Sequence, residues 1–160
     1  MNDAVRPAAP LLANVSHIAL VTPDLARLST FYVDIFGGAV ASSTGRPAWK
    51  CTIQLTASTA LHLYEVPAEH ARTRGDLPYD EGSINHFALE AASPEAFLTI
   101  RERLMAGGYT DSAVMAAPYG YSINAVDPDG LYIEITLARP PGWEPPFHVT
   151  AFMPLPADRV

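Results

Sequence analysis

Two segments of this chain carry the same order of polar and apolar residues, 69 residues apart. Residues 16–20 read Ser-His-Ile-Ala-Leu, and residues 85–89 read Asn-His-Phe-Ala-Leu. Alternating apolar residues over such a length predict a β-strand. His17 and His86 stand at the same place in the two copies, so the chain contains an internal repeat.

A segment of helical periodicity follows each predicted strand. Apolar residues recur three and four positions apart over residues 24–36 and again over residues 94–106, which predicts one amphipathic helix in each copy. A pair of glycines follows each segment, at residues 37–38 and 107–108. Glycine is the usual residue just beyond a helix end, so both helices are expected to stop there.

Short runs rich in β-forming residues complete each copy, at residues 52–55, 61–66, 121–126 and 131–137. Each copy therefore predicts one helix with about three or four strands. Neither copy could bury its apolar face alone, so we expect an α+β fold in which two tandem modules pack with a pseudo-two-fold relation. The modules cover about residues 14–67 and 83–138, joined by a linker at residues 68–82.

The two ends of the chain differ from this single domain. Residues 1–13 form an extension rich in alanine and proline, and residues 139–160 contain six prolines. The C-terminal segment is expected to be extended, because proline excludes a long helix or a central strand. Trp143 and Phe147 make it too apolar to stay in water, so it should lie on its own sheets, on the mouth of a cavity or on a second subunit.

Composition limits the function. The 160 residues are 49% hydrophobic and carry a net charge of −7, which fits one folded domain and gives no attraction to nucleic acid. No apolar run is long enough to span a membrane. Cys51 is the single cysteine, so an internal disulfide and a thiolate metal cluster are excluded. We expect an unsecreted protein of a reducing compartment, the cytoplasm, in which histidine and carboxylate groups hold any metal.

Three residues form a candidate metal site. His17 and His86 occupy equivalent, substantially buried strands, and Glu134 lies in the strongly β-forming run 131–137, where a buried carboxylate requires a cation. Two histidines and one carboxylate are a common set of ligands for Fe(II), Zn or Mn. The alternatives are two hydrogen-bonded core histidines and a solvent-facing glutamate on an edge strand.

Other residues could complete this site. His62 stands in the last strand of the first copy, as Glu134 does in the second, so it is either a fourth ligand or a pocket histidine that never contacts metal. Its strand position also makes it a candidate for the general acid or base. Tyr119 and Tyr121 could hydrogen-bond an oxyanion on the metal, although strand tyrosines are more often packed in a core or at its rim. A divalent ion held by such a set keeps open positions for a substrate with two neighbouring oxygens.

The motifs together resemble the vicinal oxygen chelate superfamily. They are His-Ile-Ala-Leu-Val-Thr-Pro-Asp-Leu from His17, Asn-His-Phe-Ala-Leu around His86, and Asp-Pro-Asp-Gly-Leu-Tyr-Ile-Glu ending at Glu134. The resemblance covers about residues 14–138. That superfamily includes glyoxalase I, extradiol ring-cleaving dioxygenases, methylmalonyl-CoA epimerase, fosfomycin resistance enzymes and bleomycin-sequestering proteins, so its motifs indicate the fold more sharply than the reaction.

The resemblance implies paired βαβββ modules whose curled sheet encloses a metal held by His17, His86 and Glu134. The fourth metal position, a Glu in glyoxalase I and a Gln in the epimerase, falls on His62. The implied cofactor is a divalent metal, with Fe(II) favoured over Zn, Ni or Mn. Extradiol-type ring cleavage of a small molecule is the first expectation, glyoxalase-type isomerisation the second and non-catalytic drug binding the third. The resemblance also implies a homodimer.

Overall fold

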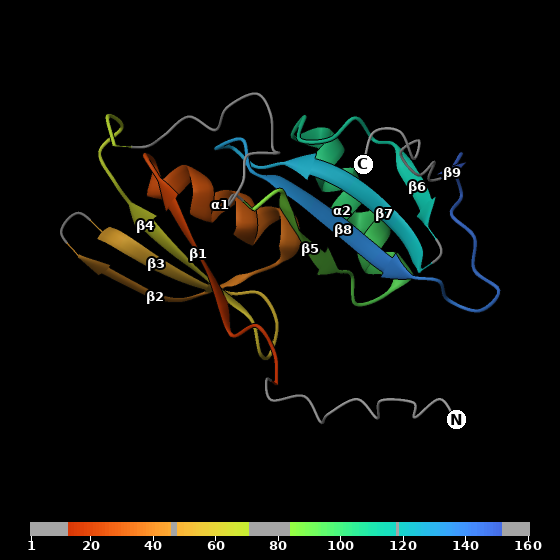
Figure 1. The fold of residues 1–160 in the computed structure, drawn as a ribbon, viewed down its shortest axis with the longest axis horizontal. Helices are drawn as coiled ribbons and strands as arrows, with labels where there is room; N and C mark the ends of the chain where they lie inside the picture. The colour runs from red at the N-terminus through yellow and green to blue at the C-terminus, as the bar shows by residue number, and fades with distance from the viewer. Residues whose placement is uncertain (1–12, 46–47, 71–83, 118, 152–160) are drawn as a thin grey trace, which may run out of the picture.

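The computed structural model of the chain describes residues 13–45, 48–70, 84–117 and 119–151. These residues form two mixed β-sheets and two helices (Figure 1). Most of the predicted linker 68–82, and the end of the chain after residue 151, lie outside the described residues. Neither helix within the described ranges is long and apolar enough to cross a membrane.

The first module is a four-stranded sheet with one helix. Its strand order is β1-β4-β3-β2, in which β1 pairs parallel to β4 and the other pairs are antiparallel. The elements are β1 (His17–Thr22), α1 (Leu25–Phe36), β2 (Ala39–Gly45), β3 (Ala48–Gln54) and β4 (Ala60–Glu65). Both β1 and β2 are edge strands of this sheet.

The second module repeats this arrangement and adds one short strand. Its order is β5-β8-β7-β6-β9, with β5 parallel to β8 and β9 parallel to β6. The elements are β5 (His86–Glu90), α2 (Pro94–Ala106), β6 (Val114–Ala117), β7 (Gly120–Val126), β8 (Tyr132–Ala138) and β9 (Thr150–Ala151). The predicted α+β fold of two βαβββ modules is confirmed, as are both helices.

The caps of α1 show why the sequence starts and stops a helix there. The Asp24 side chain accepts a hydrogen bond from the backbone N–H of Arg27 at 2.9 Å, which satisfies one of the free donors of the first turn. At the other end Gly37 has φ +72°. A residue with a Cβ would be strained in this left-handed conformation, so glycine ends the helix at low cost.

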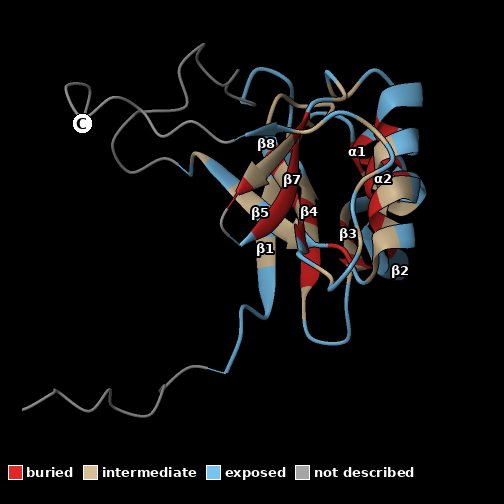
Figure 2. Cartoon of the chain, turned by 90° about the vertical axis from the view of Figure 1, so that its right-hand side faces the viewer, coloured by how far each residue is buried: buried red, intermediate tan, exposed pale blue. Residues whose placement is uncertain are grey.

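Both helices pack on the same side of the two sheets (Figure 2). The apolar core lies between the helices and the sheets. It is formed by residues that face inward from α1, α2 and the central strands, among them Leu28, Phe31, Phe97, Leu61 and Ile135. On the opposite face of the sheets, every second residue of β1 and of β5 is exposed. This helix-free face also carries the predicted metal ligands.

Helix α1 ties the two modules together through the turn between β7 and β8. The Tyr32 hydroxyl donates a hydrogen bond to Asp127 Oδ2 at 3.1 Å, and the Arg27 guanidinium pairs with the carboxylate of Asp129. Arg103 of α2 donates to the carbonyl oxygen of Asp34 near the end of α1, at 2.9 Å. These polar contacts, with the core around them, fix how the modules sit on each other.

The Asp127 carboxyl is 4% exposed. Its Oδ1 accepts backbone N–H bonds from Asp129 and Leu131, at 2.9 and 2.8 Å. Burial raises the pKa of this carboxyl above its ordinary value of 3.8, against the opposing effect of these hydrogen bonds. The group therefore takes up a proton at a higher pH on acidification than an exposed aspartate does.

We expect the Tyr32→Phe substitution to lower the free energy of unfolding by about 1–3 kcal/mol at neutral pH, because it removes a donor from a buried, ionised acceptor. The loss should become smaller as the pH falls, since a protonated Asp127 accepts a weaker hydrogen bond than a carboxylate does. Urea unfolding at several pH values measures both effects.

Tyr109→Phe is the matched control for this experiment. The Tyr109 ring packs edge-on against Phe31 with centroids 4.7 Å apart, but its hydroxyl has no hydrogen-bond partner among the residues that the structure describes. This variant should change the unfolding free energy little at any pH. Equal losses in the two variants, or a Tyr32→Phe loss that does not vary with pH, would contradict the interpretation.

The described part of the C-terminal segment lies on its own second module. Trp143 packs edge-on against Tyr121 with centroids 5.6 Å apart, and the guanidinium of Arg101 in α2 lies 4.1 Å from the centre of the Phe147 ring. Strand β9 then pairs with β6 and forms the edge of the second sheet. The described residues 139–151 contain no helix; they turn at Pro141 and Gly142 and end in the two-residue strand β9. Of the three expected places, residues 139–151 occupy the first, on the protein's own sheet.

Candidate metal centre

Two histidines form a pair on the open face of the first module. His17 is the first residue of β1, and His62 lies on β4 opposite Ala19. Their rings stack with centroids 4.2 Å apart and an angle of 16° between the planes. Nδ1 of His17 lies 3.1 Å from the Ser16 hydroxyl oxygen, so its Nε2 remains available to a ligand. We call His17 and His62 the module 1 half-site.

The surroundings keep His62 in the form that binds metal. Burial lowers the pKa of His62, and the positive charges of His17 and Lys50 lower it further. A lowered pKa leaves the imidazole neutral at neutral pH. Only the neutral ring has a free nitrogen lone pair, so His62 is prepared either to ligate a cation or to accept a proton.

A histidine and a carboxylate form a second pair, on the open face of the second module. Nε2 of His86 lies 3.3 Å from Oε2 of Glu134. Nδ1 of His86 lies 2.6 Å from Oδ1 of Asn85, and the Tyr119 hydroxyl donates to Oε1 of Glu134 at 2.9 Å. We call His86 and Glu134 the module 2 half-site. The predicted cation partner of Glu134 is present if His86 is protonated or if a metal lies between them.

The two half-sites occupy equivalent places in the two modules. His62 pairs in register with Ala19, two residues after His17, and Glu134 pairs with Ala88, two residues after His86. The symmetry that the sequence indicated between His62 and Glu134 therefore holds at the level of single residues. Each half-site brings two donor groups onto the helix-free face.

The structure does not bring the two half-sites together in one chain. Within the described ranges, no group of three or more His, Cys, Asp or Glu side chains lies close enough to hold a metal ion. The prediction that His17, His86 and Glu134 share one ion is therefore not met within a single chain. The expected burial of the two histidines is also wrong: both residues are exposed, because no helix or strand among the described residues covers the open face.

The two candidate tyrosines lie on opposite sides of the second sheet. Tyr119 contacts Glu134, and that hydrogen bond raises the pKa of its hydroxyl, which therefore stays protonated as a donor. Tyr121 pairs with Leu137 on the face of the sheet that packs against the helices. Tyr121 is 1% exposed. Its hydroxyl donates to Oε2 of Glu144 at 2.7 Å. Tyr121 is thus a core residue that holds the C-terminal segment, and only Tyr119 lies at the candidate centre.

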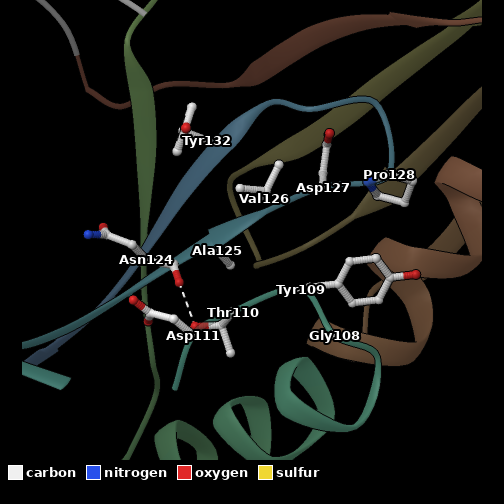
Figure 3. A pocket seen from close by; sticks show the side chains of 10 residues that line it. All are labelled: Gly108, Tyr109, Thr110, Asp111, Asn124, Ala125, Val126, Asp127, Pro128 and Tyr132. Carbon is white, nitrogen blue, oxygen red and sulfur yellow. Dashed lines mark hydrogen bonds between the residues drawn. The ribbon is translucent and has the colours of Figure 1, made fainter. Parts of the chain in front are cut away.

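A pocket of about 630 Å³ adjoins the module 2 half-site. It includes Tyr132, which pairs with His86, and Asn124, which pairs with Glu134. The Thr110 hydroxyl donates to the carbonyl oxygen of Asn124 at 2.7 Å, which holds one wall of the pocket to the strand (Figure 3). Sequence reasoning missed Asn124, although a polar residue in the apolar run 121–126 was a signal for it. The volume suits a small molecule.

Comparison with known proteins agrees with this arrangement. Residues 14–135 match the sequence profile of the Glyoxalase/Bleomycin resistance protein/Dioxygenase superfamily. The chain belongs to this superfamily. No curated protein sequence matches it.

Solved structures of several other proteins show the same fold. A glyoxylase/bleomycin resistance protein/dioxygenase domain from Frankia sp. EAN1pec has 19% identity and a TM-score of 0.69, over 80% of this chain and 99% of its own. Lactoylglutathione lyase from Agrobacterium tumefaciens has 21% identity and a TM-score of 0.59, over 84% and 100%. The fosfomycin resistance protein FosX from Listeria monocytogenes has 22% identity and a TM-score of 0.60, over 80% and 95%.

The donor groups of this superfamily member fit a divalent metal. Two ligands of one ion, each at about 2.1 Å from it, lie about 3.0–3.4 Å apart, and the 3.3 Å between His86 and Glu134 falls in that range. Because Nδ1 of His86 faces the Asn85 oxygen, its Nε2 points at the carboxylate, an arrangement that a cation between the two would stabilise. Each half-site supplies two ligands that fit one divalent ion. The four ligands of two half-sites would complete the protein part of its coordination shell.

Proposed function

We propose that this protein is a divalent-metal enzyme that acts on a small molecule which binds the metal through two neighbouring oxygens. The observation that carries the proposal is the equivalence of the two half-sites. Each places two donor groups at the same register of its module, and together they supply three imidazoles and one carboxylate. That set holds Fe(II), Zn, Ni or Mn and keeps positions open for substrate.

We further propose that the complete centre forms between two copies of the chain. The module 1 half-site of one copy would meet the module 2 half-site of the other, in a symmetric pair with two equal centres. Strands β1 and β5, which carry His17 and His86, are edge strands of their sheets. Large apolar residues beside them are exposed, with Val15 62%, Val21 61% and Ile84 62% accessible. A second copy would cover this surface.

The residues of the chain have separate tasks in this centre. Glu134 supplies the negative charge, and Tyr119 orients it by donating to Oε1, which leaves Oε2 for the ion. The bound ion would act as a Lewis acid and as a template for the two substrate oxygens. If His62 does not ligate it, the neutral His62 imidazole can take a proton from a substrate hydroxyl.

Ring cleavage of a catechol-like substrate by O2, with Fe(II), is the reaction that we favour. This reaction needs two histidines and one carboxylate to hold the iron, and a neutral base. The lowered pKa of His62 suits His62 to act as that base. Isomerisation of the glyoxalase type, with Ni or Zn, is the second candidate. The stacking of His62 on His17 supports it, because His62 can then serve as a fourth metal ligand beside His17. Among the structural neighbours are both an oxidase, ChaP-H2, and a lactoylglutathione lyase.

Metal analysis followed by two assays distinguishes these reactions. We expect protein purified without chelator to retain a divalent metal, and the Fe(II)-loaded form to consume one O2 for each catechol cleaved. Isomerisation of a glutathione hemithioacetal under Ni or Zn, without O2 uptake, would replace the first reaction by the second. If no metal is retained and chelator leaves small-molecule binding unchanged, the protein is a binding protein and the proposal is wrong.

A further inference from the structure

The open face of the first module carries one ammonium group beside the module 1 half-site. Lys50 is the single lysine of the chain. It lies on β3 opposite Tyr64 of β4, and Thr52 of β3 lies opposite His62. Residues that are directly opposite, and residues two apart on a strand, share a face of a sheet. Lys50 and Tyr64 therefore lie on the same face as His62, one repeat further along the strands.

The Lys50 ammonium lies over an aromatic ring and has no anionic partner within the described ranges. Its Nζ is 5.2 Å from the centre of the Tyr64 ring. No carboxylate or other hydrogen-bond acceptor contacts it among the residues that the structure describes. Arg27 and Arg103, by contrast, bind a carboxylate and carbonyl oxygens. Lys50 is thus held by a ring contact that leaves its charge available to a ligand.

Lys50 is also close to the proposed metal ligands. Lys50 and His62 are diagonal neighbours on β3 and β4, and such neighbours lie about 7–8 Å apart, which is roughly the distance from a pair of ring oxygens to a carboxylate on the far side of the same ring. Trp49 is 53% exposed, and its ring lies 5.9 Å from that of Tyr64. An aromatic wall therefore runs beside the ammonium.

We propose that Lys50 binds an anionic group of the substrate, so that the substrate class is a ring-borne carboxylate with two neighbouring oxygens for the metal. This inference rests on the proposed function, because the half-site supplies the other end of the same substrate. Tyr64 positions the Lys50 ammonium, and the exposed Trp49 ring supplies apolar contact area. The centre then selects against neutral molecules that carry the same chelating oxygens.

Two probes that differ by one carboxylate test this inference. Binding of catechol and of protocatechuate, which is catechol with a ring carboxylate, is measured by calorimetry on the Zn-loaded protein without O2. We expect the wild type to bind protocatechuate at least about 10-fold more tightly than catechol. Lys50→Met should bring the two affinities together by weakening protocatechuate alone. Lys50→Arg should keep most of the preference, because it keeps the charge.

Arg139→Met is the matched control. The guanidinium of Arg139 also lies over a tyrosine ring, 5.1 Å from the centre of Tyr121, so both methionine variants remove one cation from a ring. The control should leave both affinities unchanged. Equal binding of the two probes by the wild type would leave the metal function standing and overturn the role of Lys50. If neither probe binds the Zn-loaded wild type, this inference and the ring cleavage of a catechol both fail, while the metal content of the same protein decides separately whether the metal function stands.

Discussion

Two inactive variants of this chain should form one working metal centre when they are paired. One variant carries His17→Ala and His62→Ala, and the other carries His86→Ala and Glu134→Gln. In a mixed dimer, the intact module 1 half-site of the second variant meets the intact module 2 half-site of the first. The other centre of that dimer loses all four ligands. The mixed dimer should therefore hold about half of the wild-type metal per chain and show about half of its activity.

The mixed dimer is obtained by expressing the two variants together with different affinity tags and purifying on both. Metal content per chain is the main measurement, and it does not depend on knowing the substrate. Each variant expressed alone should hold almost no metal. If every centre were built within one chain, the mixed dimer would be as empty as its parents, and the proposed pairing of copies would be wrong.

The largest single-residue effect is expected for Glu134→Gln. The substitution keeps the size and the oxygen that accepts from Tyr119, but it removes the negative charge that balances the ion. Replacing even an outer partner of a metal ligand often costs 10–100-fold in metal affinity, so the loss for the ligand itself should be at least about 100-fold. Activity should fall with it, while the melting temperature of the metal-free protein stays nearly unchanged.

Glu102→Gln provides the control for this loss. Glu102 is an exposed residue of α2, and its substitution removes the same charge from the helix side of the protein. Competition with a fluorescent chelator measures metal affinity in both variants. If Glu134→Gln binds metal as tightly as Glu102→Gln does, Glu134 does not ligate the ion and serves only to contact Tyr119 and His86.

The repeat in the sequence was enough to predict the fold. The spacing of apolar residues after Asp24 and Ser93 located both helices, because an amphipathic helix and its caps are specified by residues close in sequence. Strands β2 and β6 were not predicted. Both sequences contain two alanines, β2 also has two serines, and every residue of β2 is exposed. They are strands because a neighbouring strand pairs with them, which the local pattern does not record.

The same repeat predicted which residues are equivalent at the candidate centre. His17 corresponds to His86, and His62 to Glu134, because equal modules place equal positions at equal registers. The sequence could not tell which tyrosine reaches Glu134. Tyr119 and Tyr121 are two residues apart and would share a face of one regular strand, but β7 begins only at Gly120, whose φ of +153° lets the two side chains point to different sides.

The sequence by itself determined the modules, their helices and the donor residues of each half-site, since all of these follow from local patterns and their repetition. Only the tertiary structure decided how far the half-sites lie from each other. That distance depends on how α1 packs against the turn at Asp127 and Asp129. A contact between segments about 100 residues apart leaves no periodic trace in either segment. For the same reason, only the structure shows that the face carrying His17 and His86 is open.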